Sequence, residues 1–348
     1  MFSAGLTGYN VTRGLMGALK TRAPHPDLVD ALLEVPDLDG CLRRLRAIPF
    51  LEGIEIGARP GDLESALLAA CAEFARKIRN FLGGSAGKFI ETYMQRFHIH
   101  NAKLLFKSVL EGAPEEVLDL MYPVSARYDP AVLARLKDGA DVVSFFGETK
   151  IGACLAEAHE VYRANDGDLS LFELVLDRSY VNMLWSAGVR VKFGDGRRLR
   201  RNILLPWLAS TAVLWVLWLA HYRAKTVEEI TALADLPDEL LPARIIRDLV
   251  ETGDPSVAAE ALGNRKLNEF FSGEGLPKDL VSLHRMARRF AWRLVLPARR
   301  STRFDVSTLL AAVMRWEFIV DDAITVTGAR AVGLSGEEIT SLLATRAA

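Results

Sequence analysis

The sequence predicts an all-α protein, and three observations lead to that prediction. Leucine and alanine, both strong helix formers, make up 95 of the 348 residues. The long segments carry apolar residues at helical spacing, whereas the two-residue alternation typical of strands is rare. Prolines fall mostly between these segments, where they start or end helices rather than interrupt them.

Two helices are the clearest in this pattern. Residues 63–82 and 280–295 each place apolar side chains three and four positions apart, which predicts one buried stripe per helix. Asp62 stands where an N-cap is expected and Gly83-Gly84 where the helix should end. The stripe of the first helix consists of Leu63, Leu67, Cys71, Phe74, Ile78 and Phe81.

The remaining elements recur in the same order. A third amphipathic helix is expected near 171–185. Long helical stretches follow the three amphipathic helices and begin near Phe89, Leu204 and Thr308. Shorter helical pieces precede the amphipathic helices, near 28–54, 129–158 and 241–271.

Each long stretch runs into a turn and then two glutamates with an aliphatic residue. These signatures are Glu115-Glu116-Val117, Glu228-Glu229-Ile230 and Glu337-Glu338-Ile339. A short signature can recur by chance, so the repeated order of elements is the stronger indication of an internal repeat. The sequence predicts three related helical modules, over residues 1–124, 125–240 and 241–348.

Composition excludes several classes of protein. Half of the residues are hydrophobic, which excludes an intrinsically disordered chain. The mean hydropathy of +0.14 is too low for a protein with many membrane spans. A formal net charge of −1 gives no overall attraction to nucleic acid or anionic lipid, so no nucleic-acid partner is expected.

The cysteines and the N-terminal residues bear on the compartment. Cys41, Cys71 and Cys154 are far apart and form no Cys-x-x-Cys pair, so neither a disulfide framework nor a zinc site is predicted. The first residues lack a basic stretch ahead of an apolar one, so no signal peptide is expected. A reducing compartment fits both observations.

Residues 202–222 carry no formal charge if His221 is neutral, which raises the possibility of a membrane span. Pro206 should break or start a helix, and the fourteen residues after it would span only about 21 Å of a ~30 Å hydrocarbon core. The equivalent stretches of the other two modules carry charges. We therefore expect a buried core helix, with a membrane anchor over residues 203–220 as the alternative.

No catalytic, cofactor or metal site is predicted. Gly83 to Phe89 is one residue too short for a phosphate loop and lacks its hydroxyl. His98 and His100 lie about 200° apart on a helix and cannot share one metal ion. Asp321-Asp322 with Glu317 is better explained by solvation or by ion pairs with Arg315 or Arg330. An enzyme would need a buried polar pocket in which these aspartates meet His or Arg.

Four arginines in five residues follow a turn at Gly194 to Gly196. They are Arg197, Arg198, Arg200 and Arg201. Such a cluster is usually solvated, and its most specific role would be to bind an acidic protein surface.

Several segments carry recognisable motifs. The most specific lies within residues 93–107, where Asn101 and Lys103 match the pattern Asp-Ile-x-Asn-Ile-Lys-x-Leu-Leu-Arg, and Lys107 stands in place of its last arginine. Residues 171–180 match Leu-Glu-x-x-Leu-Asp-x-x-Tyr through Glu173, Asp177 and Tyr180. Residues 315–339 match a closing pattern that begins at Glu317 and ends Gly-Leu-Ser-x-Glu-Glu-Ile.

These motifs resemble those of the C/d subunit family of the V-type (A/V-type) rotary ATPases, along nearly the whole chain. The resemblance implies a funnel of three helical modules without catalytic activity, cofactor or small-molecule substrate. It implies a rotor part at the cytoplasmic face of the membrane, peripheral to it. Its partners would be the central-shaft subunits and the proteolipid ring, between which it would transmit torque for ion transport.

Overall fold

The fold is helical throughout the part of the chain that the structure describes. The computed structural model describes residues 27–46, 60–114, 117–125, 127–191, 193–272, 280–297 and 305–346, and no strand occurs in these ranges. The predicted all-α class is therefore confirmed. The segments 1–26 and 47–59 and Glu115-Glu116, which carry parts of the predicted pattern, lie outside the described residues.

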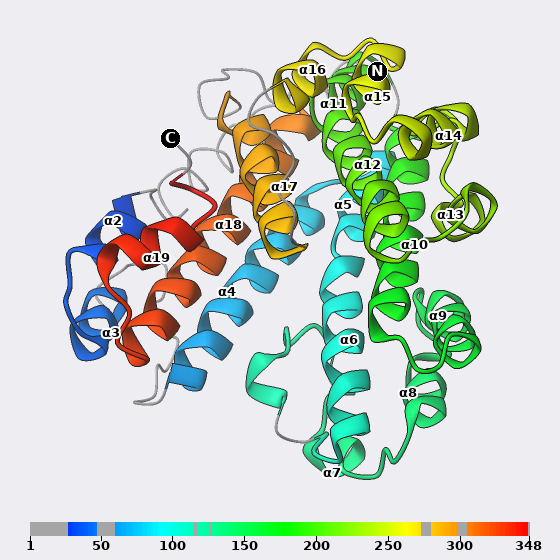
Figure 1. Ribbon diagram of the computed structural model, residues 1–348. Coiled ribbons are helices and arrows are strands. Elements are labelled where there is room, and N and C mark those ends of the chain that lie inside the picture. Colours follow the sequence, from blue (N-terminus) through cyan, green and yellow to red (C-terminus); the bar gives the residue numbers. More distant parts are fainter. Residues whose placement is uncertain are drawn as a thin grey trace, which may run out of the picture.

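Helices from the first third of the chain form the left and centre of Figure 1. They are α2 (Asp27–Leu33), α3 (Leu38–Arg46), α4 (Pro60–Phe81), α5 (Gly84–Tyr93), α6 (Gln95–Glu111) and the 3₁₀ turn η2 (Leu118–Leu120). α4 contains the predicted stripe, which is buried from Leu63 to Ile78, whereas Phe81 at its end is 51% exposed.

The middle third begins with short helices and continues with two long ones. These elements are α7 (Pro130–Leu133), α8 (Gly139–Phe146), α9 (Gly152–Ala164), α10 (Leu169–Val189), α11 (Phe193–Leu199), the π-helical turn η3 (Arg200–Leu204), α12 (Leu205–Tyr222) and α13 (Val227–Ala234).

The last third repeats that order. Its elements are α14 (Ala243–Thr252), α15 (Ser256–Ala261), α16 (Arg265–Phe271), α17 (Leu280–Val295), α18 (Val306–Ala331) and α19 (Gly336–Leu342). The predicted amphipathic helix at 280–295 is α17.

The glutamate pairs of the second and third signatures begin helices. Thr226 and Glu229 form a capping box at the start of α13, in which each side chain bonds the other residue's backbone N–H. Ser335 and Glu338 do the same at the start of α19. The repeated signature thus encodes one local structure, a capped helix after a long helix.

The turn between α4 and α5 explains the glycine-rich segment that superficially resembles a phosphate loop. Gly84 has a φ of +59°, in the left-handed region that favours glycine. A Cβ on Gly87 would lie 2.3 Å from the carbonyl oxygen of Leu82. These glycines permit a tight connection between two helices.

Pro206 does not shorten the apolar helix. α11, η3 and α12 form one continuous helix from Gly196 to Tyr222, long and apolar enough by length and composition to cross a membrane. The expectation that Pro206 limits this helix is therefore wrong. A wider π-helical turn directly before Leu205 accommodates the proline, which lies in the first turn of α12.

Most of this helix is nevertheless inside the protein. In its most apolar 18-residue window 72% is buried. Its side chains contribute to all three apolar clusters of the described core, for example Leu208, Val213 and Ala209. Burial among other helices supports the prediction of a core helix over the alternative of a membrane anchor.

Three pairings between helices far apart in sequence close a ring. α10 packs on α5 and α6, α12 packs on α17, and α18 packs on α4. In each pairing a long helix of one predicted module meets the amphipathic helix of the next, and the third returns to the first. Figure 1 shows α18 beside α4 and α6 beside α10. The six long helices therefore surround a common space.

Candidate partner-binding cleft

A cleft of about 570 Å³ lies where these helices meet. Every one of the paired long helices contributes to its lining: α4, α6, α10, α12, α17 and α18. Because each predicted module supplies two of these helices, the cleft depends on the whole chain rather than on one module.

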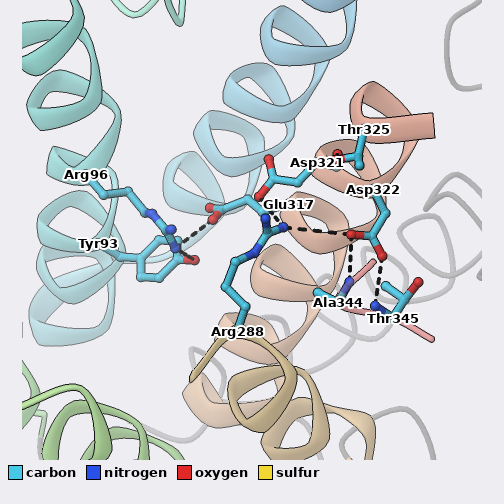
Figure 2. Close-up of polar contacts among 9 residues, drawn as sticks. All are labelled: Tyr93, Arg96, Arg288, Glu317, Asp321, Asp322, Thr325, Ala344 and Thr345. Carbon is cyan, nitrogen blue, oxygen red and sulfur yellow. Dashed lines mark hydrogen bonds and ion pairs between the residues drawn. The ribbon is translucent and has the colours of Figure 1, made fainter. Parts of the chain in front are cut away.

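Three ion pairs connect the helices across this cleft. Arg96 of α6 lies 2.7 Å from Glu317 of α18, and its guanidinium also donates to the hydroxyl of Tyr93 at 2.8 Å. Lys103 of α6 lies 2.7 Å from Asp177 of α10. The third pair joins α17 to α18 (Figure 2).

Arg288 of α17 is shared by two neighbouring carboxylates. It donates to Asp321 at 3.1 Å and lies 3.8 Å from Asp322. Asp322 is 1% exposed and accepts the backbone N–H groups of Ala344 and Thr345, so it holds the C-terminal segment (Figure 2). The predicted solvated or Arg315/Arg330-paired role of the two aspartates is corrected: Arg288 is their ion-pair partner.

Glu317 is the most buried of the carboxylates that line the cleft. Its side chain is 6% exposed. Burial and the charge of Asp321 raise its pKa to about 7, against the opposing effect of Arg96. Through its ion pair with Arg96, this buried carboxyl joins α18 to α6.

The predicted motif residues fall into two groups. Lys103, Asp177, Tyr180 and Glu317 line the cleft together, and the Tyr180 hydroxyl donates to the carbonyl of Tyr93 at 3.2 Å. The others lie around it.

Asn101 lies behind the cleft wall, fully buried. Its side chain donates to the carbonyl of Tyr122 and accepts from the N–H of the same residue, both at 2.8 Å. Glu173 lies 3.9 Å from Lys103 at the exposed edge. Lys107 is exposed and 3.9 Å from Glu111 on its own helix, away from the cleft.

The four arginines of the predicted basic cluster also fall into two groups. Arg198 pairs with Asp305 at 3.1 Å, and Arg200 donates to the carbonyls of Gly188 and Val189 at the end of α10. Arg197 and Arg201 are exposed. Two of the four arginines therefore serve the fold and two face solvent.

Each of the two histidines of α6 contacts a residue of a neighbouring segment. His98 Nδ1 lies 3.1 Å from the Tyr128 hydroxyl, and His100 Nε2 lies 3.3 Å from the carbonyl of Leu120. Burial lowers the pKa of both. Among the residues that the structure describes, no group of three His, Cys, Asp or Glu is placed to hold a metal ion.

Several cleft residues were not predicted from the sequence. They are Glu64, Arg96, Trp207, Thr211, Trp215 and Arg288. Trp207, Thr211 and Trp215 are four residues apart on α12, a spacing that marks one helical face. That spacing was available in the sequence, but it does not tell which face a partner would meet.

The fold and the cleft define a class of protein: an all-helical protein, over the residues that the structure describes, in which charged side chains join helices around one cleft. A family comparison gives the particular family. Residues 14–342 match the family of the ATP synthase (C/AC39) subunit, and the chain belongs to this family. It is thus a structural, non-catalytic subunit of a V/A-type ATP synthase, a membrane-associated complex with several components. A comparison with curated proteins gave no match.

Family membership also decides between the predicted alternatives. The soluble-enzyme alternative required aspartates that meet His or Arg in a polar pocket, and Arg288 does meet Asp321 at the cleft. The contact belongs to a structural subunit, however, and the carboxylates are occupied by Arg288 and by backbone N–H groups.

Proposed function

We propose that this protein is the central-stalk rotor subunit that couples the central shaft to the membrane proteolipid ring. The observation that carries the proposal is the ring of three helix pairings around one cleft. A part that transmits torque needs a rigid frame and a seat for its partner. The three helix pairings would supply the rigid frame, and the cleft would supply the seat.

The frame is stiffened by ion pairs between helices that are far apart in the sequence. Three ion pairs each join two different helices around the cleft: Lys103–Asp177, Arg96–Glu317 and Arg288–Asp321. Salt bridges at half-exposed positions contribute little stability, but they fix the relative orientation of the helices that carry them. Three predicted modules joined in a ring would form the funnel, with the shaft end seated in it.

The proposed place of the subunit is the cytoplasmic face of the membrane, attached peripherally to the ring. Burial of the apolar helix within the protein supports attachment through partners rather than insertion. Alkaline carbonate extraction of native membranes should release a peripheral subunit, whereas an inserted helix would retain it.

A pull-down of the tagged protein from native membranes tests the partners. Shaft subunits and proteolipid should copurify with the wild-type protein, and their absence would contradict the proposal. Thr211→Trp, which fills the cleft from α12, should lose the shaft while it keeps the ring. The matched control Ser272→Trp adds the same tryptophan side chain at an exposed position outside the cleft. It should retain both the shaft subunits and the proteolipid.

A further inference from the structure

The charges around the cleft do not balance. The charged residues that line it are Arg96, Lys103, Arg288, Glu64, Asp177, Glu317 and Asp321. Each cation is already engaged by at least one carboxylate, and Arg288 is shared by two. One carboxylate, that of Glu64, is left over.

Glu64 lies on the cleft-facing side of α4 and is half-buried. It makes no hydrogen bond or ion pair with the residues that the structure describes. Desolvation by burial and the charge of Asp321 raise the pKa of Glu64. A carboxylate that is partly withdrawn from water beside a second acidic group lacks a counter-charge.

A second acidic group in the cleft is also incompletely satisfied. Glu317 is more than nine-tenths buried, and Arg96 occupies its Oε2. Its Oε1 is buried and has no hydrogen-bond donor. Buried polar atoms are normally paired, so an acceptor without a donor is an unusual feature of this wall of the cleft.

The cleft is also lined by aromatic side chains. Trp207 and Trp215 of α12 line the cleft and are only partly buried, as is Phe318 of α18. Arg288 already lies 5.9 Å from the centre of the Phe318 ring. Aromatic faces attract a cation, particularly one withdrawn from water, so these aromatic side chains and the unpaired carboxylate favour the same kind of ligand.

We propose that the cleft receives a lysine or arginine side chain from the end of the central shaft, which pairs with Glu64 beside Asp321 and lies against the tryptophans of α12. This inference rests on the proposed function, because it takes the shaft as the occupant. Charge complementarity is the argument for that side chain: an incoming cation supplies the missing counter-charge.

Binding of the purified cognate shaft subunits to the full-length protein, measured by biolayer interferometry, tests the pairing. Glu64→Gln keeps the size and removes the charge, and should weaken binding about tenfold, as expected for loss of a charge-assisted hydrogen bond. Glu73→Gln is the matched control, with the same change on α4 in an exposed surface pair with Arg76, and should bind like the wild type.

Two further readouts separate charge pairing from structural damage. Glu64→Gln should raise the melting temperature slightly, because it removes an unpaired, half-buried charge. Its affinity should also depend less on salt than that of the wild type. Stability and affinity would thus change in opposite directions.

The outcomes distinguish this inference from the proposed function. If Glu64→Gln binds the shaft with wild-type affinity and salt dependence while Thr211→Trp still abolishes binding, the pairing with Glu64 is overturned. The shaft would then still occupy the cleft. A shaft that does not bind the wild type, or that binds Thr211→Trp equally well, would overturn both.

Discussion

Lys266 Nζ donates a hydrogen bond of 2.8 Å to the carbonyl oxygen of Asn202. Four residues after Asn202 the chain has Pro206, whose missing N–H would otherwise have bonded that carbonyl in an α-helix. The neighbouring carbonyl of Arg201 lies 3.5 Å from Nδ2 of Asn264. The start of α16 therefore supplies donors where the proline removes one, and the helix continues unbroken.

Lys266→Met should lower the stability of the whole protein. The change keeps the apolar stem but removes the donor from the water-accessible carbonyl of Asn202, at a cost of about 0.5–1.5 kcal/mol. Urea unfolding followed by circular dichroism measures it. Arg265→Met is the control, since Arg265 is 91% exposed in a surface pair with Glu269 and should change stability by less than about 0.5 kcal/mol. Equal effects of the two substitutions would contradict the role of Lys266.

Asn101→Ala should lower the stability of the protein by more than the loss of a few side-chain atoms suggests. Removal of the side chain leaves both the N–H and the carbonyl of Tyr122 unpaired in a buried place, at about 2–4 kcal/mol. Asn101→Asp retains an acceptor but loses the donor, and introduces a buried charge, so it should not rescue stability. Thermal unfolding checks both. A melting temperature within about 1 °C of the wild type, which for a chain of 348 residues corresponds to less than about 1 kcal/mol, would contradict this prediction.

Leu217→Arg should make the isolated protein insoluble. Leu217 is 3% exposed among the apolar residues that surround α12, and an arginine there has no partner for its charge. The soluble fraction after expression is the measurement. His221→Arg adds the same side chain at an exposed position on the same helix and should remain soluble. A soluble, stable Leu217→Arg protein would count against burial of this helix.

Local sequence rules predicted the elements well, because each depends on residues near one another. The stripe from Leu63 to Ile78 and the segment 280–295 both predicted helices from apolar spacing alone, although α4 begins at Pro60, so Asp62 lies in its first turn and is not the predicted N-cap. The prediction for Pro206 failed because a π-helical turn directly before α12 accommodates the proline, and a side chain from a distant helix, Lys266, donates to the carbonyl of Asn202.

The cleft, unlike the individual helices, is formed by residues that lie far apart in the sequence. Arg288 and Asp321 are 33 residues apart, and Arg96 and Glu317 more than 200. Nothing in the local spacing of either residue identifies the other as its partner. The family motifs did locate Lys103, Asp177, Tyr180 and Glu317, which share the cleft lining, but the motif gave no information about Glu64 or the tryptophans of α12.

Glu317 predicts an unusual pH dependence of stability. Burial and the nearby Asp321 raise its pKa to about 7 in the folded protein, even though Arg96 lowers it. In the unfolded chain a glutamate releases its proton near pH 4.3. Between these values the folded state holds a proton that the unfolded state has lost, so stability falls as the pH rises from about 4.5 to 7.

The free energy of unfolding of the wild type, minus that of Glu317→Gln, isolates this group from the other titrating residues. It should decrease by up to about 3 kcal/mol between pH 5 and pH 7.5, because the glutamine has no proton to lose. Urea unfolding at pH 5, 6, 7 and 7.5 measures the difference. Glu111→Gln, the same change at an exposed position on α6, is the matched control. A difference for Glu317→Gln that stays constant or grows with pH would mean that Glu317 is ionised throughout, held by Arg96 more strongly than burial opposes it.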